Sequence, residues 1–348
     1  MKKNILVTGA GGRSVGSGIL YALTRTNNGA KKRWNVIATD ADPFSWGLYK
    51  ADVGQILPFA KDPNYIKKIK SIINKYHIDA IIPGTQEEGE ILTKSAAKLA
   101  PIPIVANRRE LYPLMMDKFA ASQALNNLGA ETIETLPLSQ WEKIVDKFGF
   151  PVIVKPTKGT GGSRGLHIVA SKAELEEILS KSDESTAPCI QPYIGSEDQE
   201  YTVGVLTDND GDLIDSIVMK RKLVGLSLLE KRNIGSKSYA ISTGYSQGFI
   251  IKNKKIQDFC ENLALRLEST GPLNIQLRVA NKKIYVFEIH PRFSGTTPIR
   301  ASVGFNEVDI LLRNYLFDEK FSRIHYQYNV AAIRAFEHVI VPIKNMKK

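Results

Sequence analysis

The residues with the clearest chemical potential lie in one predicted hairpin near residue 280. Two runs rich in β-branched and aromatic residues, Leu273–Val279 and Ile284–Ile289, flank a short polar stretch, which is typical of two antiparallel strands. With a three-residue loop at Asn281–Lys283, Gln276 lies opposite Glu288, and opposed residues have Cβ atoms only about 5 Å apart. An amide oxygen and a carboxylate at that separation can hold one Mg²⁺ ion, which leaves its other positions to water or phosphate oxygens. A surface hairpin with polar residues on its wet face would explain the same sequence.

Further polar residues belong to the same face of this hairpin. The pairing adds Asn274 and Arg278 on one strand, and Val286 and His290 on the other, because side chains alternate along a strand. Imidazole is a poor ligand for Mg²⁺ and suits later transition metals better, so we expect His290 either to hydrogen-bond beside the metal or to favour Mn²⁺. Arg292, just beyond the strand, would add a fixed positive charge.

A lysine followed by a glycine-rich loop forms a second group. The strand-like run Val152–Val154 delivers Lys155 at its end, and four glycines follow within Gly159–Gly165. Glycine lets the backbone approach phosphate oxygens without a Cβ clash, and consecutive amides can bind an anion. We therefore expect Lys155 to hold a phosphate while the loop closes over it. A flexible hairpin without a ligand is the alternative, but a lysine at the end of the strand favours phosphate binding.

The first residues show the strand, glycine turn and helix of a nucleotide-binding domain. A strand at Asn4–Thr8 leads into the glycines of Gly9–Gly18, and a second strand, Asn35–Thr39, ends at Asp40. In a dehydrogenase this aspartate would bind the ribose hydroxyls of a dinucleotide. An NAD-dependent oxidoreductase is therefore an alternative function. We favour the interpretation that these glycines allow tight packing between strand and helix.

Periodicity predicts the other elements that position these groups. The strand Ala80–Ile82 is followed by Thr85–Glu88, and ligands in an open α/β sheet lie outside the carboxyl ends of the strands, so Glu88 is a candidate substrate contact. A helix N-cap with acidic first-turn residues explains these letters equally well. The remaining predicted elements are helices at Asp62–Tyr76, Ala173–Lys181, Ile256–Leu267 and Glu307–Leu316, and a second hairpin of Thr202–Thr207 and Leu213–Met219.

Composition limits the class of protein. The chain has 348 residues, 43% of them apolar, which predicts two or three packed subdomains. No apolar run is long enough to cross a bilayer and no signal peptide is visible, and the two cysteines, Cys189 and Cys260, have no metal-ligand spacing. We therefore expect a cytoplasmic location. The formal charge of +11 admits a polyanionic partner, but the lysines are dispersed without aromatic interleaving, so we expect neither a nucleic-acid nor a membrane partner.

Taken together, these motifs resemble a known family. Lys155 with its glycine loop, the stretch Gln191–Glu200, then Gln276 and Glu288–Arg292 resemble in order the ATP-grasp ligases similar to the large subunit of carbamoyl phosphate synthase. The resemblance implies a mixed α/β and α+β fold. Residues 1–106 would form a Rossmann-like N-terminal domain, 107–188 a first ATP-grasp lobe with the glycine-rich loop, and 189–348 a second lobe with the metal site. One departure is His290, because the family usually has Asn there.

The resemblance also implies roles for individual residues. The metal ligands would be Gln276, Glu288 and His290, and the charges that assist phosphoryl transfer would be Arg292 and Lys155. Contacts to ATP would come from Lys118, Lys155, Gly159, Gly161, Gly162, Ser163, Gln191, Tyr193, Ile194 and Glu200. Substrate contacts would come from Glu88, Lys220, Arg221, Ser236 and Arg300. In this scheme Gln191 faces the adenine amino group, the backbone near Ile194 faces a ring nitrogen, and Glu200 binds the ribose.

The implied activity is ligation of a carboxylate to an amine, or to a thiol, at the expense of ATP. A carboxylate is a poor electrophile, and its phosphorylation by MgATP supplies a leaving group that the amine then displaces. The expected partners are small-molecule carboxylate and amine substrates, and a homodimer follows from the habit of the family. The alternatives are the NAD-dependent oxidoreductase and a module that binds ATP without turnover.

Overall fold

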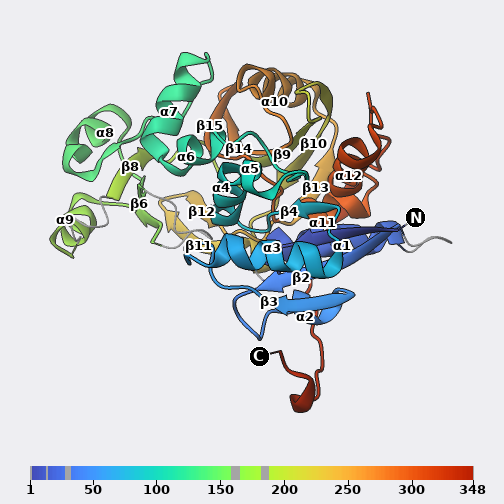
Figure 1. Ribbon diagram of the computed structural model, residues 1–348. Coiled ribbons are helices and arrows are strands. Elements are labelled where there is room, and N and C mark those ends of the chain that lie inside the picture. Colours follow the sequence, from blue (N-terminus) through green and yellow to red (C-terminus); the bar gives the residue numbers. More distant parts are fainter. Residues whose placement is uncertain (1, 13–14, 28–32, 158–164, 182–187, 348) are drawn as a thin grey trace.

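The N-terminal domain is a parallel sheet with helices on both faces (Figure 1). The computed structural model of the chain describes residues 2–12, 15–27, 33–157, 165–181 and 188–347. The elements of this domain are β1 (Lys3–Val7), α1 (Val15–Asn27), β2 (Trp34–Asp40), α2 (Gly47–Lys50), β3 (Val53–Ile56), α3 (Tyr65–Tyr76), β4 (Ala80–Ile82), α4 (Gln86–Lys94) and α5 (Ala96–Leu99). The strand order is β3-β2-β1-β4. Leu6 and Ile37 pack toward α3, whereas Val7 and Ala38 pack toward α1, as alternation along buried strands requires.

The first lobe is an antiparallel sheet backed by two helices. Before it come α6 (Leu111–Met116) and α7 (Lys118–Asn127), whose buried side chains join the core of the large sheet described below. The elements of the lobe itself are β5 (Leu136–Pro137), a 3₁₀ turn (Leu138–Gln140), α8 (Trp141–Phe148), β6 (Val152–Pro156), β7 (His167–Val169), α9 (Lys172–Lys181) and β8 (Pro188–Pro192). The strand order is β5-β8-β6-β7, and Val154 and Ile190 join a cluster with Ile144 of α8 and Leu175 of α9. Because β8 pairs with β6, the lobe continues to Pro192, beyond the boundary that we predicted at residue 188.

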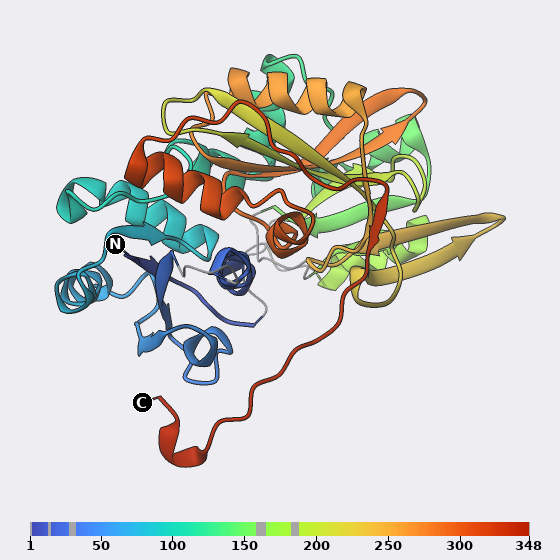
Figure 2. The same ribbon diagram turned by 90° about the vertical axis from the view of Figure 1, so that its right-hand side faces the viewer.

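The second lobe contains the largest sheet, in the order β15-β14-β9-β10-β13-β16. Its elements are β9 (Glu200–Thr207), β10 (Leu213–Arg221), a 3₁₀ turn (Gly225–Ser227), β11 (Leu228–Ile234), β12 (Lys237–Ser242), β13 (Gly248–Ile251), α10 (Lys254–Arg266), β14 (Pro272–Ala280), β15 (Lys283–His290), α11 (Thr297–Ser302), α12 (Glu307–Phe317), β16 (Val330–Ala332) and a 3₁₀ turn (Ile343–Asn345). Strands β11 and β12 form a separate ribbon that projects from the body (Figure 2). In the part of the chain that is described, no helix has the length and apolarity needed to span a membrane.

The N-terminal domain and the second lobe share one hydrophobic core. Helix α1 packs beside α11 and α12, and one cluster joins Ile19 and Leu23 of α1 with Phe305 and Leu311 (Figure 2). The Trp34 indole nitrogen also donates a hydrogen bond of 2.9 Å to the Asp309 carboxylate. The start of α4, which follows β4, lies next to the β14–β15 hairpin, where Gln86 contacts His290.

The β14–β15 hairpin has the predicted pairing of Gln276 with Glu288, but its turn is shorter than we predicted. Its turn has two residues, Asn281 and Lys282, both left-handed with φ of 49° and 63°. Such a turn is a usual connection between antiparallel strands, and Asn accepts this conformation readily. A shorter turn alone would have shifted the pairing, but a bulge at Phe287 restores Gln276 opposite Glu288 and Asn274 opposite His290.

The bulge also corrects one residue of the predicted polar face. Val286 pairs with Leu277 and is buried in the hydrophobic core, so it does not lie beside Glu288 as we predicted. The extra residue of a bulge shifts the alternation of side chains on one strand only. The polar face on β15 is therefore restricted to the end of the strand.

Candidate active site

The predicted metal ligands Gln276 and Glu288 meet across the β14–β15 hairpin. The Gln276 amide nitrogen Nε2 donates to Glu288 Oε2 at 2.9 Å, and Glu288 Oε1 lies 3.3 Å from His290 Nε2. The other ring nitrogen of His290, Nδ1, is 3.1 Å from the amide oxygen of Gln86 at the start of α4. His290 thus links Glu288 of the hairpin to Gln86 of the N-terminal domain.

Glu288 keeps both a negative charge and access to solvent. Its side chain is 40% exposed. Burial of the carboxyl by itself would raise its pKa, but interactions with His290, Lys155 and Lys118 outweigh that effect and bring the pKa to about 2. The carboxylate is therefore ionised at neutral pH, as a metal ligand must be.

The donor set fits a hard cation that shares its coordination shell with phosphate. Gln276 and Glu288 offer oxygen atoms, and Mg²⁺ is often bound by one or two carboxylates together with phosphate and water oxygens. Within the described ranges, no group of three or more His, Cys, Asp and Glu side chains could hold a metal ion unaided. Gln276 would have to rotate its amide, because its nitrogen faces Glu288 and its oxygen lies 3.4 Å from an Arg221 nitrogen.

Lys155 lies near this carboxylate and is provided by the first lobe. It is close to the end of β6, as predicted, and is only 6% exposed. Burial lowers the pKa of Lys155, and Lys118 lowers it further, whereas Cys189 and Glu288 act in the opposite direction. A phosphate bound at this position would compensate the Lys155 ammonium for the hydration that it loses on burial.

Lys118 approaches the same region from α7. The carboxylate of Asp117 accepts hydrogen bonds from the Phe119 and Ala120 amides and so caps this helix. The Lys118 ammonium lies 3.4 Å from the carbonyl oxygen of Thr157, where the glycine-rich stretch begins. The four predicted loop contacts lie outside the described residues and are Gly159, Gly161, Gly162 and Ser163.

Arg292 follows the hairpin, and one hydrogen-bond donor of its guanidinium has no partner among the described residues. Its Nη1 donates to the carbonyl oxygen of Phe293 at 2.8 Å, and within the described residues its buried Nε has no hydrogen-bond partner. Burial lowers the pKa of Arg292, while the charge of Glu288 opposes that change. A buried donor without a partner is costly, so this atom is suited to a ligand that brings an acceptor.

The predicted adenine contacts lie where the first lobe ends. Gln191 is on β8, 6% exposed, and its amide nitrogen Nε2 lies 2.5 Å from the hydroxyl of Thr135. Tyr193 packs edge-on against Tyr239 of the ribbon, with ring centroids 4.9 Å apart, and its hydroxyl donates to the carbonyl of Ala240 at 2.9 Å. These contacts join the end of β8 to the second lobe.

Glu200, the predicted ribose ligand, is enclosed by two arginines. It is 2% exposed, and its two oxygens lie 2.9 Å from Arg221 and 3.0 Å from Arg278. Burial would raise the pKa of Glu200, but the two guanidinium groups lower it below its ordinary value. Arg221, which we predicted as a substrate contact, therefore serves this buried ion pair. It also lies 3.4 Å from the amide oxygen of Gln276, a predicted metal ligand.

Arg278 lies beside the candidate site, although the sequence analysis assigned it no role there. Its guanidinium lies 4.1 Å from the ring centroid of Tyr193 and donates to the carbonyl of Ile194 at 3.0 Å. It thereby holds the segment that we expect to contact adenine. The sequence placed Arg278 two residues from Gln276 on the same predicted face, which could have marked it as part of the site. The sequence did not show that Glu200, Tyr193 and Ile194 contact its guanidinium.

Glu88 is turned into the N-terminal domain. It accepts hydrogen bonds from Tyr65 at 3.1 Å and from Thr85 at 3.0 Å, and it is 7% exposed. Burial raises its pKa to about 7, against the lowering effect of these hydroxyl groups. A Cβ atom added to Gly9 would lie 2.3 Å from Glu88 Oε2. The carboxyl group therefore occupies the first turn, where a dinucleotide would place its pyrophosphate, which argues against the oxidoreductase alternative.

Three other predicted substrate contacts lie elsewhere. Lys220 neighbours Arg221 on β10 and so points to the opposite face, which α10 covers. Ser236 is exposed in the turn at the tip of the β11–β12 ribbon. Arg300 is 3% exposed and forms an ion pair of 3.0 Å with Glu307, while donating to Asn274 at 2.7 Å. In each case the sequence shows the residue type but not which distant segments surround the side chain.

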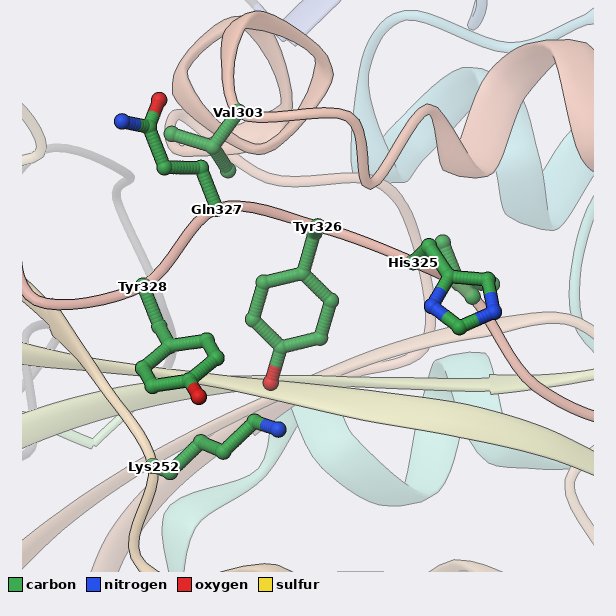
Figure 3. A pocket seen from close by; sticks show the side chains of 7 residues that line it. Lys252, Val303, His325, Tyr326, Gln327 and Tyr328 are labelled. Atoms are coloured by element: carbon green, nitrogen blue, oxygen red, sulfur yellow. The ribbon is translucent and has the colours of Figure 1, made fainter.

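A cavity of about 500 Å³ lies away from these residues. Tyr326, Tyr328 and Lys252 line one side of it, and Val303 and Gln327 lie across from Lys252 (Figure 3). The Lys252 ammonium is 4.2 Å from the ring centroid of Tyr328. None of the predicted site residues lines this cavity.

Comparison with known proteins divides the chain into two matched parts. Residues 5–106 match the family model described as the PylC-like, N-terminal domain. Residues 117–311 match the model described as the carbamoyl-phosphate synthase L chain, ATP binding domain. The second match covers more than half of the chain and includes Lys155, Gln276 and Glu288.

Curated relatives are large chains of carbamoyl phosphate synthases. The arginine-specific large chain of Geobacillus stearothermophilus is 24% identical over 310 residues, which are 86% of this chain and 28% of that protein. The large chain of Lachnoclostridium phytofermentans is 24% identical over 366 aligned positions, which cover 100% of this chain and 32% of that protein. The chain thus spans about a third of the length of these relatives.

Solved structures show the same fold. An N5-carboxyaminoimidazole ribonucleotide synthetase in complex with ADP has a TM-score of 0.67 and 15% identity, with 93% of this chain and 79% of that chain covered. The biotin carboxylase domain dimer of Hydrogenobacter thermophilus 2-oxoglutarate carboxylase, in complex with MgADP, has a TM-score of 0.65 and 16% identity, with 92% and 70% covered.

These matches confirm the predicted resemblance, the α/β and α+β architecture and the order of the domains. They also support, at the level of the family, the expectation of an ATP-dependent ligase. The chain belongs to the family of carbamoyl-phosphate synthase L chain ATP-binding domains and has the ATP-grasp fold.

Proposed function

We propose that this protein joins a small carboxylate to an amine, or to a thiol, with ATP as the energy source. In this reaction the γ-phosphoryl group of ATP moves to a carboxylate oxygen, which releases ADP and forms an acyl phosphate. The nucleophile then attacks the carbonyl carbon, and inorganic phosphate leaves. The observation that carries the proposal is the ionised Glu288 opposite Gln276, with positive charges of both lobes around it.

Charge neutralisation and positioning are the work of this chain's residues. We propose that Lys155 and Lys118 hold phosphate oxygens and that Arg292 directs its unpaired Nε toward the transferred group. Gln276 and Glu288 would hold Mg²⁺, which neutralises phosphate charge when bound. Mn²⁺ is the alternative metal if His290 becomes a ligand, because imidazole suits later transition metals better.

The substrates are proposed to lie between the hairpin and the N-terminal domain. His290 and Gln86 already meet across this boundary, and α4 begins there. Glu88, on the same helix as Gln86, is held in place by its hydrogen bonds to Tyr65 and Thr85. Since the curated relatives are about three times as long, the acid and amine of this chain need not be theirs. A homodimer is part of the proposal and is tested by light scattering.

The decisive experiment measures ADP release from ATP. Candidate amino acids and small acids are supplied in pairs with Mg²⁺ or Mn²⁺, and the product is identified by mass spectrometry. We expect ADP to form only when both an acid and a nucleophile are present. ATP that binds but is never converted to ADP would favour the module without turnover. Binding of a nicotinamide cofactor that survives Lys155→Ala would favour the oxidoreductase.

A further inference from the structure

The amide of Gln191 is held in one orientation by Thr135. The hydroxyl of Thr135 donates to the carbonyl oxygen of Ile133 at 2.9 Å, and the Gln191 amide nitrogen lies 2.5 Å from the same hydroxyl. A hydroxyl group has one proton to donate and two lone pairs to accept with. Because that proton is used on Ile133, Thr135 can only accept from Gln191. The NH₂ group of Gln191 therefore faces Thr135, and its oxygen Oε1 is directed elsewhere.

Gln191 shares a face of the first-lobe sheet with Lys155. On paired antiparallel strands, Lys155 lies opposite Cys189 and Ile153 lies opposite Gln191, so these four residues belong to one face. Val154 and the other members of the helix-packed cluster belong to the opposite face. A nucleotide whose phosphates reach Lys155 along this face would bring its base to the end of β8. This step rests on the proposed function.

We propose that Thr135 is a positioning residue that makes the site select a purine with an amino group at position 6. The fixed oxygen of Gln191 accepts a hydrogen bond from such an amine. A keto group at position 6, as in hypoxanthine or guanine, would place its oxygen against the Gln191 amide oxygen, and two acceptors repel each other. Without the Thr135 hydroxyl the amide could turn and offer its NH₂ group to the keto oxygen, so selectivity would fall.

The test compares the binding of ADP and inosine 5′-diphosphate, with Mg²⁺, by calorimetry. We expect the wild-type protein to prefer ADP by roughly ten- to a hundredfold, the range for one hydrogen bond against one unpaired polar group. Thr135→Val should reduce this ratio about tenfold. Thr135→Ser, which keeps the hydroxyl, should restore it. Should the valine variant not fold, Thr135→Ala removes the same acceptor with less bulk.

Thr132→Val is the matched control. Thr132 lies in the same segment, but its hydroxyl pairs with Ser122 and Asn126, both at 2.8 Å. It should leave the ADP preference unchanged. An unchanged ratio in folded Thr135→Val or Thr135→Ala would overturn the role of Thr135 alone. A wild-type protein that binds neither nucleotide would overturn the proposed function, and this inference with it.

Discussion

Two glutamates of the large sheet, Glu200 on β9 and Glu288 on β15, differ in what surrounds them although only β14 separates their strands. Glu200 is 2% exposed and paired with two arginines, whereas the side chain of Glu288 is 40% exposed and contacts an amide and an imidazole. Both carboxylates have a lowered pKa. The comparison teaches that ionisation alone does not identify a ligand site. Glu288 differs from Glu200 because solvent can reach its side chain.

The largest effect is expected from removing the buried charge. Glu200→Gln leaves Arg221 and Arg278 without their counter-charge in the interior, so we expect a loss of about 3–5 kcal/mol in the free energy of unfolding. Urea denaturation measures it. The matched control is Glu197→Gln, because Glu197 is 30% exposed and pairs with Lys231 on the surface, where the loss should be below about 1 kcal/mol. Equal losses for the two variants would contradict the comparison.

The open carboxylate should behave in the opposite way. Glu288→Gln removes the charge that would hold the metal, and we expect ATP turnover to fall about a hundredfold or more. The loss in unfolding free energy should be smaller than that in Glu200→Gln, because solvent reaches the site. The assay is ADP release at saturating Mg²⁺. Glu131→Gln, which removes the partner of Lys283 at the other end of the hairpin, should retain full activity. A fully active Glu288→Gln would remove the metal assignment.

A third carboxyl group, that of Glu88, differs from both because its hydrogen-bond partners are the neutral hydroxyl groups of Tyr65 and Thr85. Because its pKa is raised to about 7 in the folded protein, its protonated form stabilises the fold below its ordinary value of 4.5. That contribution is lost as the pH rises through 7, and amounts to about 3 kcal/mol at most.

Glu88→Gln, which cannot ionise, should therefore gain stability relative to the wild type between pH 5 and pH 8. Thermal melts at a series of pH values measure the difference. A constant difference between the two proteins across this range would show that Glu88 does not titrate there.

The smallest effect concerns an ion pair that bridges the lobes. Arg232 of the β11–β12 ribbon lies 2.6 Å from Glu174 of α9, and their side chains are 34% and 36% exposed. The hydrogen bond from Arg232 lowers the pKa of Glu174. Water and salt screen such a pair, so Arg232→Ala should cost about 0.5 kcal/mol or less and nothing in 1 M salt.

A charge exchange tests whether this contact is electrostatic. Arg232→Glu should weaken ATP binding several-fold by repelling the first lobe, and Glu174→Arg in the same chain should restore it. The KM for ATP measures both. Removing the Lys181–Glu177 pair, which lies within α9, is the control, because it does not join the lobes. Failure of the exchange to restore the KM would show that the pair has no part in closing the cleft.

Much of the fold was predictable because the relevant signals are local. Alternation and β-branched residues located β4 and β6 and both strands of the β14–β15 hairpin. The pairing of Gln276 with Glu288 was also predicted, although the turn was wrong, because a bulge compensated for the shorter loop. The boundary near residue 188 was wrong, because the pairing of β8 with β6 is not a local property.

The sequence by itself determined where the charged groups lie along their strands, since strand periodicity assigns each side chain to a face. Only the tertiary structure decided which charged side chains are paired in the interior and which remain accessible to solvent. Arg221 and Arg278 lie 21 and 78 residues from Glu200 in the chain, and no local pattern reports that they close around it. Glu288 stays accessible because its neighbours are an amide and an imidazole that leave its oxygens open to solvent. Access depends on packing among distant segments, which residue types and their spacing do not encode locally.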